Sequence, residues 1–267
     1  MSGADLALIL DAATAAGERA QTVRRAGLTT TTKADGTPVT NADIEVDSLL
    51  KEILTAARPD YGWLSEETAD DSSRLEKQRL FVVDPIDGTQ SYLKGKPFWS
   101  VSIAIVEHRR PTHAALVAPD VEETYHAEVG RGALWNGQAI APTNVHAIED
   151  CAMLGDKPMF GHPAWRTPWP PMRIENRNSI AYRMGLVARG AFDAAVALSS
   201  KGEWDLAAGD LIATEAGCLV TTHKGKTLVY NKVKPSFRSM ICAGPALHRF
   251  ILERVEPIEL PGSTEAD

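Results

Sequence analysis

Cysteine is scarce in this 267-residue chain, which has only Cys151, Cys218 and Cys242 and no C-x-x-C pair. A structural zinc site or a disulfide framework is therefore not expected. The chain also lacks a long apolar run, because residues 6–10 form a segment too short to span a membrane. No basic segment precedes that run, so we expect no signal peptide and a location in the reduced cytoplasm.

An excess of basic charge is absent as well. The chain has 28 Lys and Arg against 35 Asp and Glu, for a net charge of −7. Such a chain has no surplus of cations to displace the counterions of DNA or RNA, so a nucleic-acid polymer is not an expected partner. A small anionic substrate stays possible, because local basic residues can outweigh the overall sign.

The most informative stretch is Asp84-Pro85-Ile86-Asp87-Gly88-Thr89, which follows the apolar run 80–83. The run predicts a buried strand, and two carboxylates then stand three residues apart where it ends. Gly88 permits a sharp turn, after which the N–H groups of Gly88 and Thr89 can face an anion. Carboxylates this close favour a hard cation. An ordinary strand-ending turn is the alternative reading, because Asp, Pro and Gly are common in turns.

Two further acidic stretches accompany this one. Ser65-Glu66-Glu67-Thr68 lies upstream, and Trp204-Asp205 opens an apolar helical pattern downstream. Structural readings compete here too, since Glu66 and Glu67 could form a solvated loop pair and Asp205 could simply N-cap the helix. In the same way, Asp43 could form a capping box with Thr40.

The order and spacing of these three stretches resemble the inositol monophosphatase superfamily of metal-dependent phosphomonoesterases. The likeness runs from about Lys33 to Gly217. It implies direct attack of a metal-activated water on phosphorus, with two or three Mg²⁺ per site. One ion would be held by Glu66, Asp84 and the Ile86 carbonyl, and another by Asp84, Asp87 and Asp205.

The resemblance also implies roles for other residues. Thr89, Asp43 and Glu66 would be catalytic, with Thr89 and Asp43 orienting the attacking water. Gly88, Thr89 and Asp87 would contact the substrate phosphate. The D-x-D arrangement of haloacid-dehalogenase-type phosphatases is excluded, because the carboxylates at 84 and 87 stand one residue too far apart.

The substrate is less well indicated. Members that act on inositol phosphates carry an acidic residue where this chain has Ala197-Leu198-Ser199-Ser200. Arg173, Arg177 and Arg183 could instead meet a second phosphate, and the segment 179–183 resembles the bacterial 3'(2'),5'-bisphosphate nucleotidase branch. We expect that activity and Arg183 as a substrate contact. The alternatives are an inositol-1-monophosphatase, a sugar or histidinol phosphatase, and a non-catalytic metal-binding scaffold. Lithium inhibition and a homodimer are further expectations from the resemblance.

Hydrophobic periodicity predicts helices and strands in separate layers. The fold class expected is α+β followed by α/β, and the resemblance implies a layered αβαβα sandwich. Residues 1–146 would form an α+β half with the metal site, and residues 147–267 an α/β half that completes the site and substrate pocket. We expect residues 28–39, with Lys33 and Asp35, to be a mobile loop, and the polar tail from Glu256 to be frayed. Helices are predicted at 4–27, 40–58, 179–189, 205–216 and 245–255, and a short helical or turn segment at 90–96. Strands are predicted at 80–83, 100–106, 113–118, 123–128, 132–135, 151–154, 192–198 and 240–243.

Overall fold

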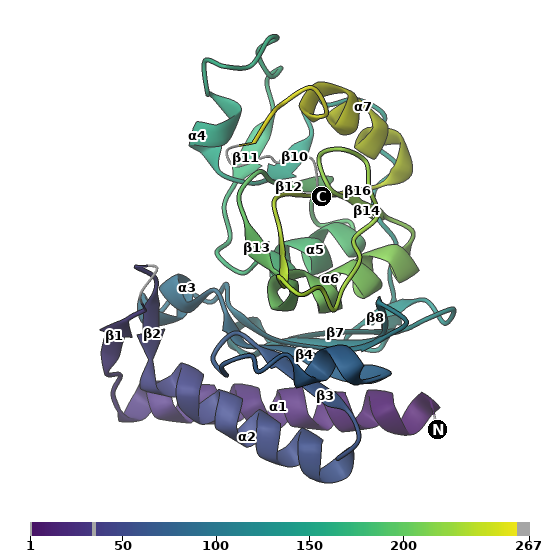
Figure 1. Ribbon diagram of the computed structural model, residues 1–267. Helices are drawn as coiled ribbons and strands as arrows, with labels where there is room; N and C mark the ends of the chain where they lie inside the picture. The colour runs from purple at the N-terminus through teal and green to yellow at the C-terminus, as the bar shows by residue number, and fades with distance from the viewer. Residues whose placement is uncertain (1, 34–35, 261–267) are drawn as a thin grey trace.

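The computed structural model describes residues 2–33 and 36–260 of the chain. Helices and sheets alternate as layers in the order α, β, α, β, α (Figure 1). The predicted αβαβα sandwich is thus confirmed. Its helical layers consist, from the bottom of Figure 1 upward, of α1 (Ser2–Ala26) with α2 (Asn41–Ala57), α5 (Ile180–Ala188) with α6 (Glu203–Ala216), and α7 (Pro245–Val255).

The lower sheet lies between the α1–α2 layer and the α5–α6 layer. Within the described residues it has seven strands in the order β3-β4-β5-β6-β7-β8-β9. Only the β3–β4 pair is parallel. Its strands are β3 (Gly62–Ser65), β4 (Arg79–Asp87), β5 (Ser100–Glu107), β6 (Arg110–Ala118), β7 (Glu123–Glu128), β8 (Ala133–Trp135) and β9 (Gln138–Ala139).

The upper sheet lies between the α5–α6 layer and α7. In the described part of the chain its strand order is β11-β10-β12-β16-β14, with β11, β10 and β12 mutually parallel. Its strands are β10 (Ala152–Leu154), β11 (Arg173–Glu175), β12 (Ala194–Ala197), β14 (Leu219–Thr221) and β16 (Met240–Ala243). The smaller elements are α3 (Thr89–Leu93), α4 (Lys157–Phe160), β13 (Lys201–Gly202), β15 (Ser236–Phe237) and the 3₁₀ turns Ser73–Glu76 and Pro119–Val121.

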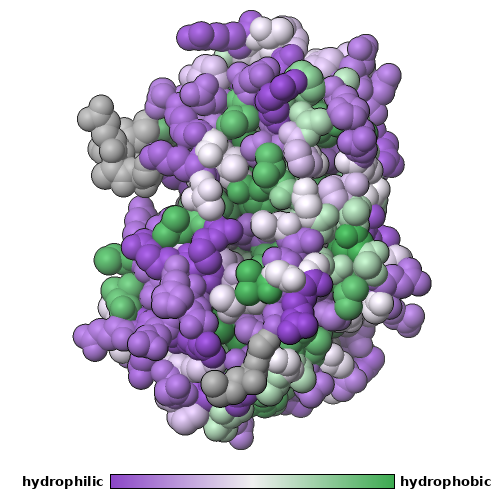
Figure 2. All heavy atoms as spheres, turned by 90° about the vertical axis from the view of Figure 1, so that its right-hand side faces the viewer, coloured by the Kyte–Doolittle hydropathy of each residue, from purple (hydrophilic) through white to green (hydrophobic). Residues whose placement is uncertain are grey.

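Strand β4 is apolar on both faces because helices cover both faces of the sheet. Leu80 and Val82 belong to the core shared with α5 and α6. Phe81 and Val83 point the other way, into the core between the lower sheet and helices α1 and α2. On the face seen in Figure 2, hydrophilic residues predominate and smaller hydrophobic groups lie at mid-height.

The segment 28–39 departs from the expected loop. Strands β1 (Thr30–Thr32) and β2 (Pro38–Thr40) pair there as an antiparallel hairpin. The run of threonines explains the difference, because β-branched residues favour extended backbone. Lys33 follows β1 directly, and Asp35 lies outside the described residues. Much of the tail expected from Glu256, residues 261–267, also lies outside them.

The division into halves 1–146 and 147–267 stays a prediction. It falls between the last strand of the lower sheet and the first strand of the upper one, in the link formed by residues 140–151. Helices α5 and α6 contact the lower sheet, and α5 also contacts β12 and β16 of the upper sheet. Among the described helices, none has the length and apolarity needed to cross a membrane.

Candidate metal centre

Two carboxylates stand on the same side of β4 because its pairing with β5 changes register between them. Asp84 lies opposite Ser102 and Asp87 lies opposite Ser100, so three steps on β4 match two on β5. In a regular strand, residues three apart point to opposite faces. The extra residue reverses that alternation. The Ile86 side chain therefore packs in the core between the lower sheet and helices α1 and α2, and Asp87 turns toward α5.

The Asp87 carboxylate is held at the beginning of α5. Its Oδ2 accepts hydrogen bonds from Ser179 Oγ at 2.6 Å and from the Ala181 N–H at 2.7 Å. Its Oδ1 accepts the Ile180 N–H at 3.2 Å. A negative group is stabilised at this end of a helix, because free N–H groups point at it. This contact joins the lower sheet to the middle helical layer through a residue of the acidic motif.

Glu66 lies directly after β3, beside the end of β4. Its N–H donates to the Val83 carbonyl at 3.3 Å, which continues the parallel pairing of the two strands. The ammonium group of Lys33 lies 2.7 Å from both Glu66 Oε1 and Glu67 Oε1. Burial lowers the pKa of Lys33, but the charge of Glu66 and the hydrogen bonds to both glutamates outweigh it and raise this pKa overall. Sequence reasoning assigned no function to Lys33.

Asp205 comes from the first turn of α6, but it is not the N-cap residue that the sequence suggested. Gly202 occupies that position, and its N–H donates to Asp205 Oδ2 at 2.8 Å. The helix begins earlier because an acid at the third helical position can bind back to the N-cap N–H. One carboxylate oxygen is used in this contact.

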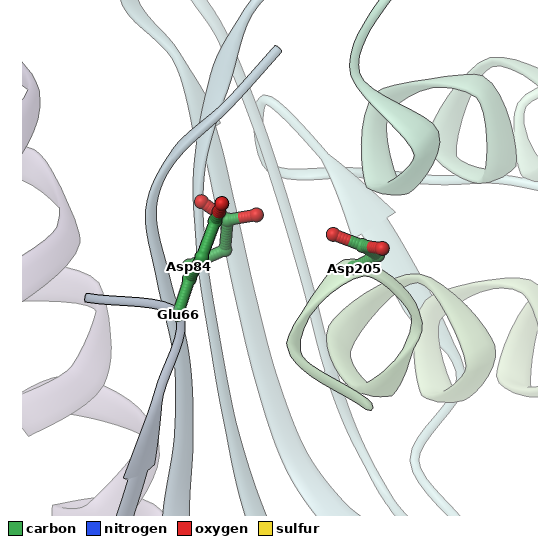
Figure 3. Close-up of side chains that lie close together, drawn as sticks. All are labelled: Glu66, Asp84 and Asp205. Atoms are coloured by element: carbon green, nitrogen blue, oxygen red, sulfur yellow. The ribbon is translucent and has the colours of Figure 1, made fainter. Parts of the chain in front are cut away.

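The structure brings Glu66, Asp84 and Asp205 together. One oxygen of each lies within 4.8 Å of the others, although the residues come from the segment after β3, from β4 and from α6. Figure 3 shows the Glu66 and Asp84 side chains next to each other, with Asp205 facing them from α6. Asp87 is outside this closest group, since its hydrogen bonds direct it to α5.

The electrostatics of this cluster favour a cation. Burial, and then the charges of Glu66, Asp87 and Asp205, hold the pKa of Asp84 well above its usual range. Burial raises the pKa of Asp87 to about 6 in spite of its hydrogen bonds, and burial together with the Asp87 charge raises the pKa of Asp205 to about 8. These shifts reflect carboxylates that lack enough compensating positive charge.

A divalent cation fits the residues that are present. Asp84 Oδ2 is buried and has no hydrogen-bond partner among the residues that the structure describes, whereas Asp84 Oδ1 accepts the Ile86 N–H at 3.0 Å. An unpaired buried carboxylate oxygen is costly and calls for a partner. The available donors are all oxygens, which suits Mg²⁺, Ca²⁺ or Mn²⁺ better than a soft metal ion.

Thr89 and Asp43 lie beside the carboxylates. Thr89 Oγ1 is 3.3 Å from Asp43 Oδ1 and 3.2 Å from the Ile86 carbonyl oxygen. Asp43 Oδ2 accepts the Thr40 N–H at 2.8 Å and the Thr40 hydroxyl at 2.6 Å. The capping box suggested by the sequence is therefore present. Asp43 still has one oxygen facing Thr89.

Gly88 is required by the turn after Asp87. Its φ of +95° is a left-handed conformation that a residue with a side chain rarely adopts. A Cβ atom there would lie 2.9 Å from the Ser179 nitrogen and 3.1 Å from the Phe98 carbonyl oxygen. The glycine thus allows Asp87 to reach α5 while Thr89 turns back toward Asp43.

The arginines considered as substrate contacts have partners within the protein. Arg183 is buried, and its guanidinium group donates to the Arg177 carbonyl and, at 2.7 Å, to Asn176 Oδ1. Arg177 pairs with Glu175 at 2.6 Å and lies over the ring of Phe98. A substrate contact for Arg183 stays a prediction.

The family model and the sequence relatives that this chain matches all point to one family of phosphatases. A model of the inositol monophosphatase family matches residues 5–259. A histidinol-phosphatase of Mycobacterium tuberculosis is 31% identical over 84% of this chain and 86% of its own length. The 3'(2'),5'-bisphosphate nucleotidase CysQ of Aggregatibacter actinomycetemcomitans is 30% identical, over 86% of this chain and 90% of its own length.

Solved structures show the same fold. An IMPase of Thermotoga maritima superposes with a TM-score of 0.81 at 26% identity and covers 96% of this chain and 97% of its own. The inositol-monophosphate-bound form of SaIMPase-II is 21% identical, with a TM-score of 0.78 over 95% of this chain and 94% of its own, and supports the fold alone.

Proposed function

The chain belongs to the inositol monophosphatase family, and on that premise we propose that it is a metal-dependent phosphomonoesterase acting on a small phosphorylated metabolite. The observation that carries this proposal is the meeting of Glu66, Asp84 and Asp205 within 4.8 Å, with Asp84 Oδ2 buried and unpaired. An unpaired buried carboxylate oxygen is costly unless a cation is bound there, so this observation supports the metal site on which the proposed activity depends.

The proposed cofactor is Mg²⁺, with two or three ions per site. Glu66, Asp84 and Asp205 hold them, and the Ile86 carbonyl and Asp87 are the further ligands in this proposal. Bound Mg²⁺ supplies an activated water and neutralises charge on the phosphate. Asp87 still has lone pairs, because a carboxylate can accept about four hydrogen bonds or metal contacts and three are used here.

The protein's own residues position the reacting groups. In this proposal the Thr89 hydroxyl orients the attacking water and Asp43 holds the water's proton, which is supported by the 3.3 Å contact between the Thr89 hydroxyl and Asp43 Oδ1. Glu66 is the third residue proposed to act in catalysis. The N–H groups of Gly88 and Thr89 and the side chain of Asp87 complete the proposed phosphate site.

The proposed activity is that of a 3'(2'),5'-bisphosphate nucleotidase. Because β10, β11 and β12 are parallel neighbours, the residues that follow them meet at one edge of the upper sheet. Basic residues follow each strand there, namely Lys157, Arg177 and Lys201. The field of Lys201 reaches the metal centre, since it opposes the rise in the pKa of Asp205. A second phosphate on the substrate would find positive charge at this edge.

The relatives do not choose between substrates, because a histidinol-phosphatase and a bisphosphate nucleotidase match at 31% and 30% identity. A substrate panel decides. We expect 3'-phosphoadenosine 5'-phosphate to be cleaved with a higher kcat/KM than inositol 1-phosphate or histidinol phosphate. The reverse ranking would favour the inositol-1-monophosphatase or histidinol-phosphatase alternative.

The reaction class is tested by phosphate release with Mg²⁺ and with EDTA. We expect release only with Mg²⁺, and strong loss in Asp87→Asn. A matched control is Glu45→Gln, which removes a carboxylate from the exposed Arg19–Glu45 pair. No release from any of these substrates would favour the non-catalytic scaffold.

Two further expectations have their own tests. Lithium at millimolar concentration should inhibit phosphate release, and light scattering should give the mass of a homodimer.

A further inference from the structure

Both ends of the Glu66-Glu67 segment are tied to one carboxylate on helix α2. Asp47 Oδ1 accepts a short hydrogen bond from the Ser65 hydroxyl, and Asp47 Oδ2 accepts the Thr68 hydroxyl at 2.6 Å. Asp47 is only 6% exposed, so these bonds are shielded from water. Hydrogen bonds to an ionised acceptor are stronger than those between neutral groups. One carboxylate thus fixes the residue before Glu66 and the residue after Glu67.

Lys33 holds the two glutamate side chains of this segment, with its Nζ 2.7 Å from both Glu66 Oε1 and Glu67 Oε1, but the backbone bonds of the segment are long. The Glu66 N–H contacts Val83 at 3.3 Å, and the Glu67 N–H contacts Ser65 Oγ at 3.5 Å, both at or beyond ordinary hydrogen-bond length. The Glu66 side chain is 25% exposed, and Lys33 Nζ contacts its Oε1 at 2.7 Å. The direction of the Glu66 carboxylate depends on this ion pair and also on the backbone from which it extends, which Asp47 holds through Ser65 and Thr68.

Helix α2 presents a second carboxylate on the same face. Asp43 lies one turn before Asp47, and residues four apart on a helix are neighbours on its surface. Asp43 contacts Thr89 beyond the end of β4, while Asp47 contacts the segment after β3. One rigid helix therefore sets the spacing between the Glu66 segment and the turn at Thr89.

We propose that Asp47 is a positioning residue for the divalent-cation site, and that it keeps the Glu66 carboxylate directed at Asp84 and Asp205. This inference rests on the proposed function, because it concerns the same metal centre. Both carboxylate oxygens of Asp47 accept hydrogen bonds from the hydroxyls of Ser65 and Thr68. Asp47 is therefore proposed to affect metal binding through Glu66 and not by direct contact with the ion. Removal of partners that orient metal ligands typically weakens metal binding about 10- to 100-fold.

The test measures Mg²⁺ and Mn²⁺ binding by titration calorimetry on the full-length protein, without substrate. We expect Asp47→Ala to raise the Kd about 10- to 100-fold. Ser65→Ala and Thr68→Val each remove one of the two bonds, so each should raise it less. Asp47→Asn keeps the shape and one acceptor, and should retain most of the affinity. Glu45→Gln, on the same helix, should bind as the wild type does.

A merely structural role gives a different pattern. If Asp47 only stabilised the fold, Asp47→Ala would lower the Tm and leave the Kd of the folded fraction unchanged. Activity gives a second readout, since loss of positioning raises the Mg²⁺ concentration for half-maximal rate more than it lowers kcat. If Asp47→Ala does not fold, Thr68→Val and Ser65→Ala decide the question.

The outcomes separate the inference from the proposed function. A wild-type protein that binds neither ion would overturn both. Wild-type binding, together with a Kd within two-fold of wild type in Asp47→Ala or in both hydroxyl variants, would overturn the role of Asp47 alone. A graded rise, largest in Asp47→Ala and absent in Glu45→Gln, supports it.

Discussion

Buried charge is compensated differently in two regions that are proposed to line one site. The first is formed by the ends of β3 and β4, and the second by the edge of the upper sheet. At β4, Asp84 keeps one buried oxygen without a partner, and nearby carboxylates raise its pKa. Arg183 of α5 is also buried, but it donates to Arg177 and Asn176, which follow β11 of the upper sheet. Charge left unpaired by folding marks a place for a ligand, whereas charge that is already paired holds the fold together.

The largest effect is expected where charge is unpaired. Asp84→Asn should lower phosphate release about 10³-fold or more, because Asp84 is proposed to hold both ions. The same change should raise the Tm of the metal-free protein, since it removes a buried charge surrounded by like charges. Phosphate release and thermal unfolding with and without Mg²⁺ measure both effects. A metal-free Tm below that of the wild type would show that the Asp84 charge is compensated after all.

A smaller loss is expected for Thr89, whose neutral hydroxyl already contacts Asp43 Oδ1 at 3.3 Å. Thr89→Val should lower kcat about 10²-fold, the usual size of effect for a group that aids proton transfer. Thr89→Ser keeps the hydroxyl that faces Asp43 and should stay within about five-fold of the wild type. The Kd for Mg²⁺ should not change in either variant. Equal rates for both variants would mean that the hydroxyl plays no part.

Arg183 tests the other side of the comparison. If it contacts a second phosphate as predicted, Arg183→Lys should lower kcat/KM about 10-fold for 3'-phosphoadenosine 5'-phosphate, because Lys cannot reproduce a bidentate contact. Inositol 1-phosphate has a single phosphate and should be affected much less. Equal losses for both substrates, with a lower Tm, would assign Arg183 to the fold, as its contacts with Asn176 and Arg177 already do in part.

The smallest effect is expected for Arg173, which is exposed and pairs with Glu175 at 3.2 Å. Arg173→Ala should change the free energy of unfolding by less than about 0.5 kcal/mol, since surface ion pairs contribute little. The KM for either substrate should change less than about two-fold on the same ground. Urea unfolding and steady-state kinetics measure this. A large rise in KM would place Arg173 among the substrate contacts.

Local periodicity predicted helices and strands in separate layers, whereas the αβαβα sandwich and the set of acidic ligands were implied by the resemblance to the family. Of that set, the structure brings Glu66, Asp84 and Asp205 together. The apolar run before Asp84, the glycine at 88 and the capping pair Thr40 and Asp43 are all readable within a few residues. The contact of Asp87 with Ser179 was not readable, since it joins positions 92 residues apart. The start of α6 was misplaced because Gly202 has no side chain to signal a cap.

The hairpin β1–β2 has a local signal in the sequence, namely its run of threonines. Its threonines are β-branched, and their strand preference could have predicted extended backbone before Lys33. The role of Asp47 had no signal of its own, because an acid within an amphipathic helix resembles any solvated residue. Its burial follows only from the packing of α2 against the strand ends.

The register shift in β4 ties the metal centre to the length of the chain as well as to its composition. A substitution of Asp84 or Asp87 changes the side chain that is offered to the metal ion. It does not change the face of the sheet on which that side chain lies. Removing one residue between them would restore simple alternation and also place the two acids two positions apart, on one face without a bulge. A separation of three positions with a bulge and a separation of two positions without one thus place both acids on the same face of the sheet. One arrangement can change into the other only by insertion or deletion of a residue.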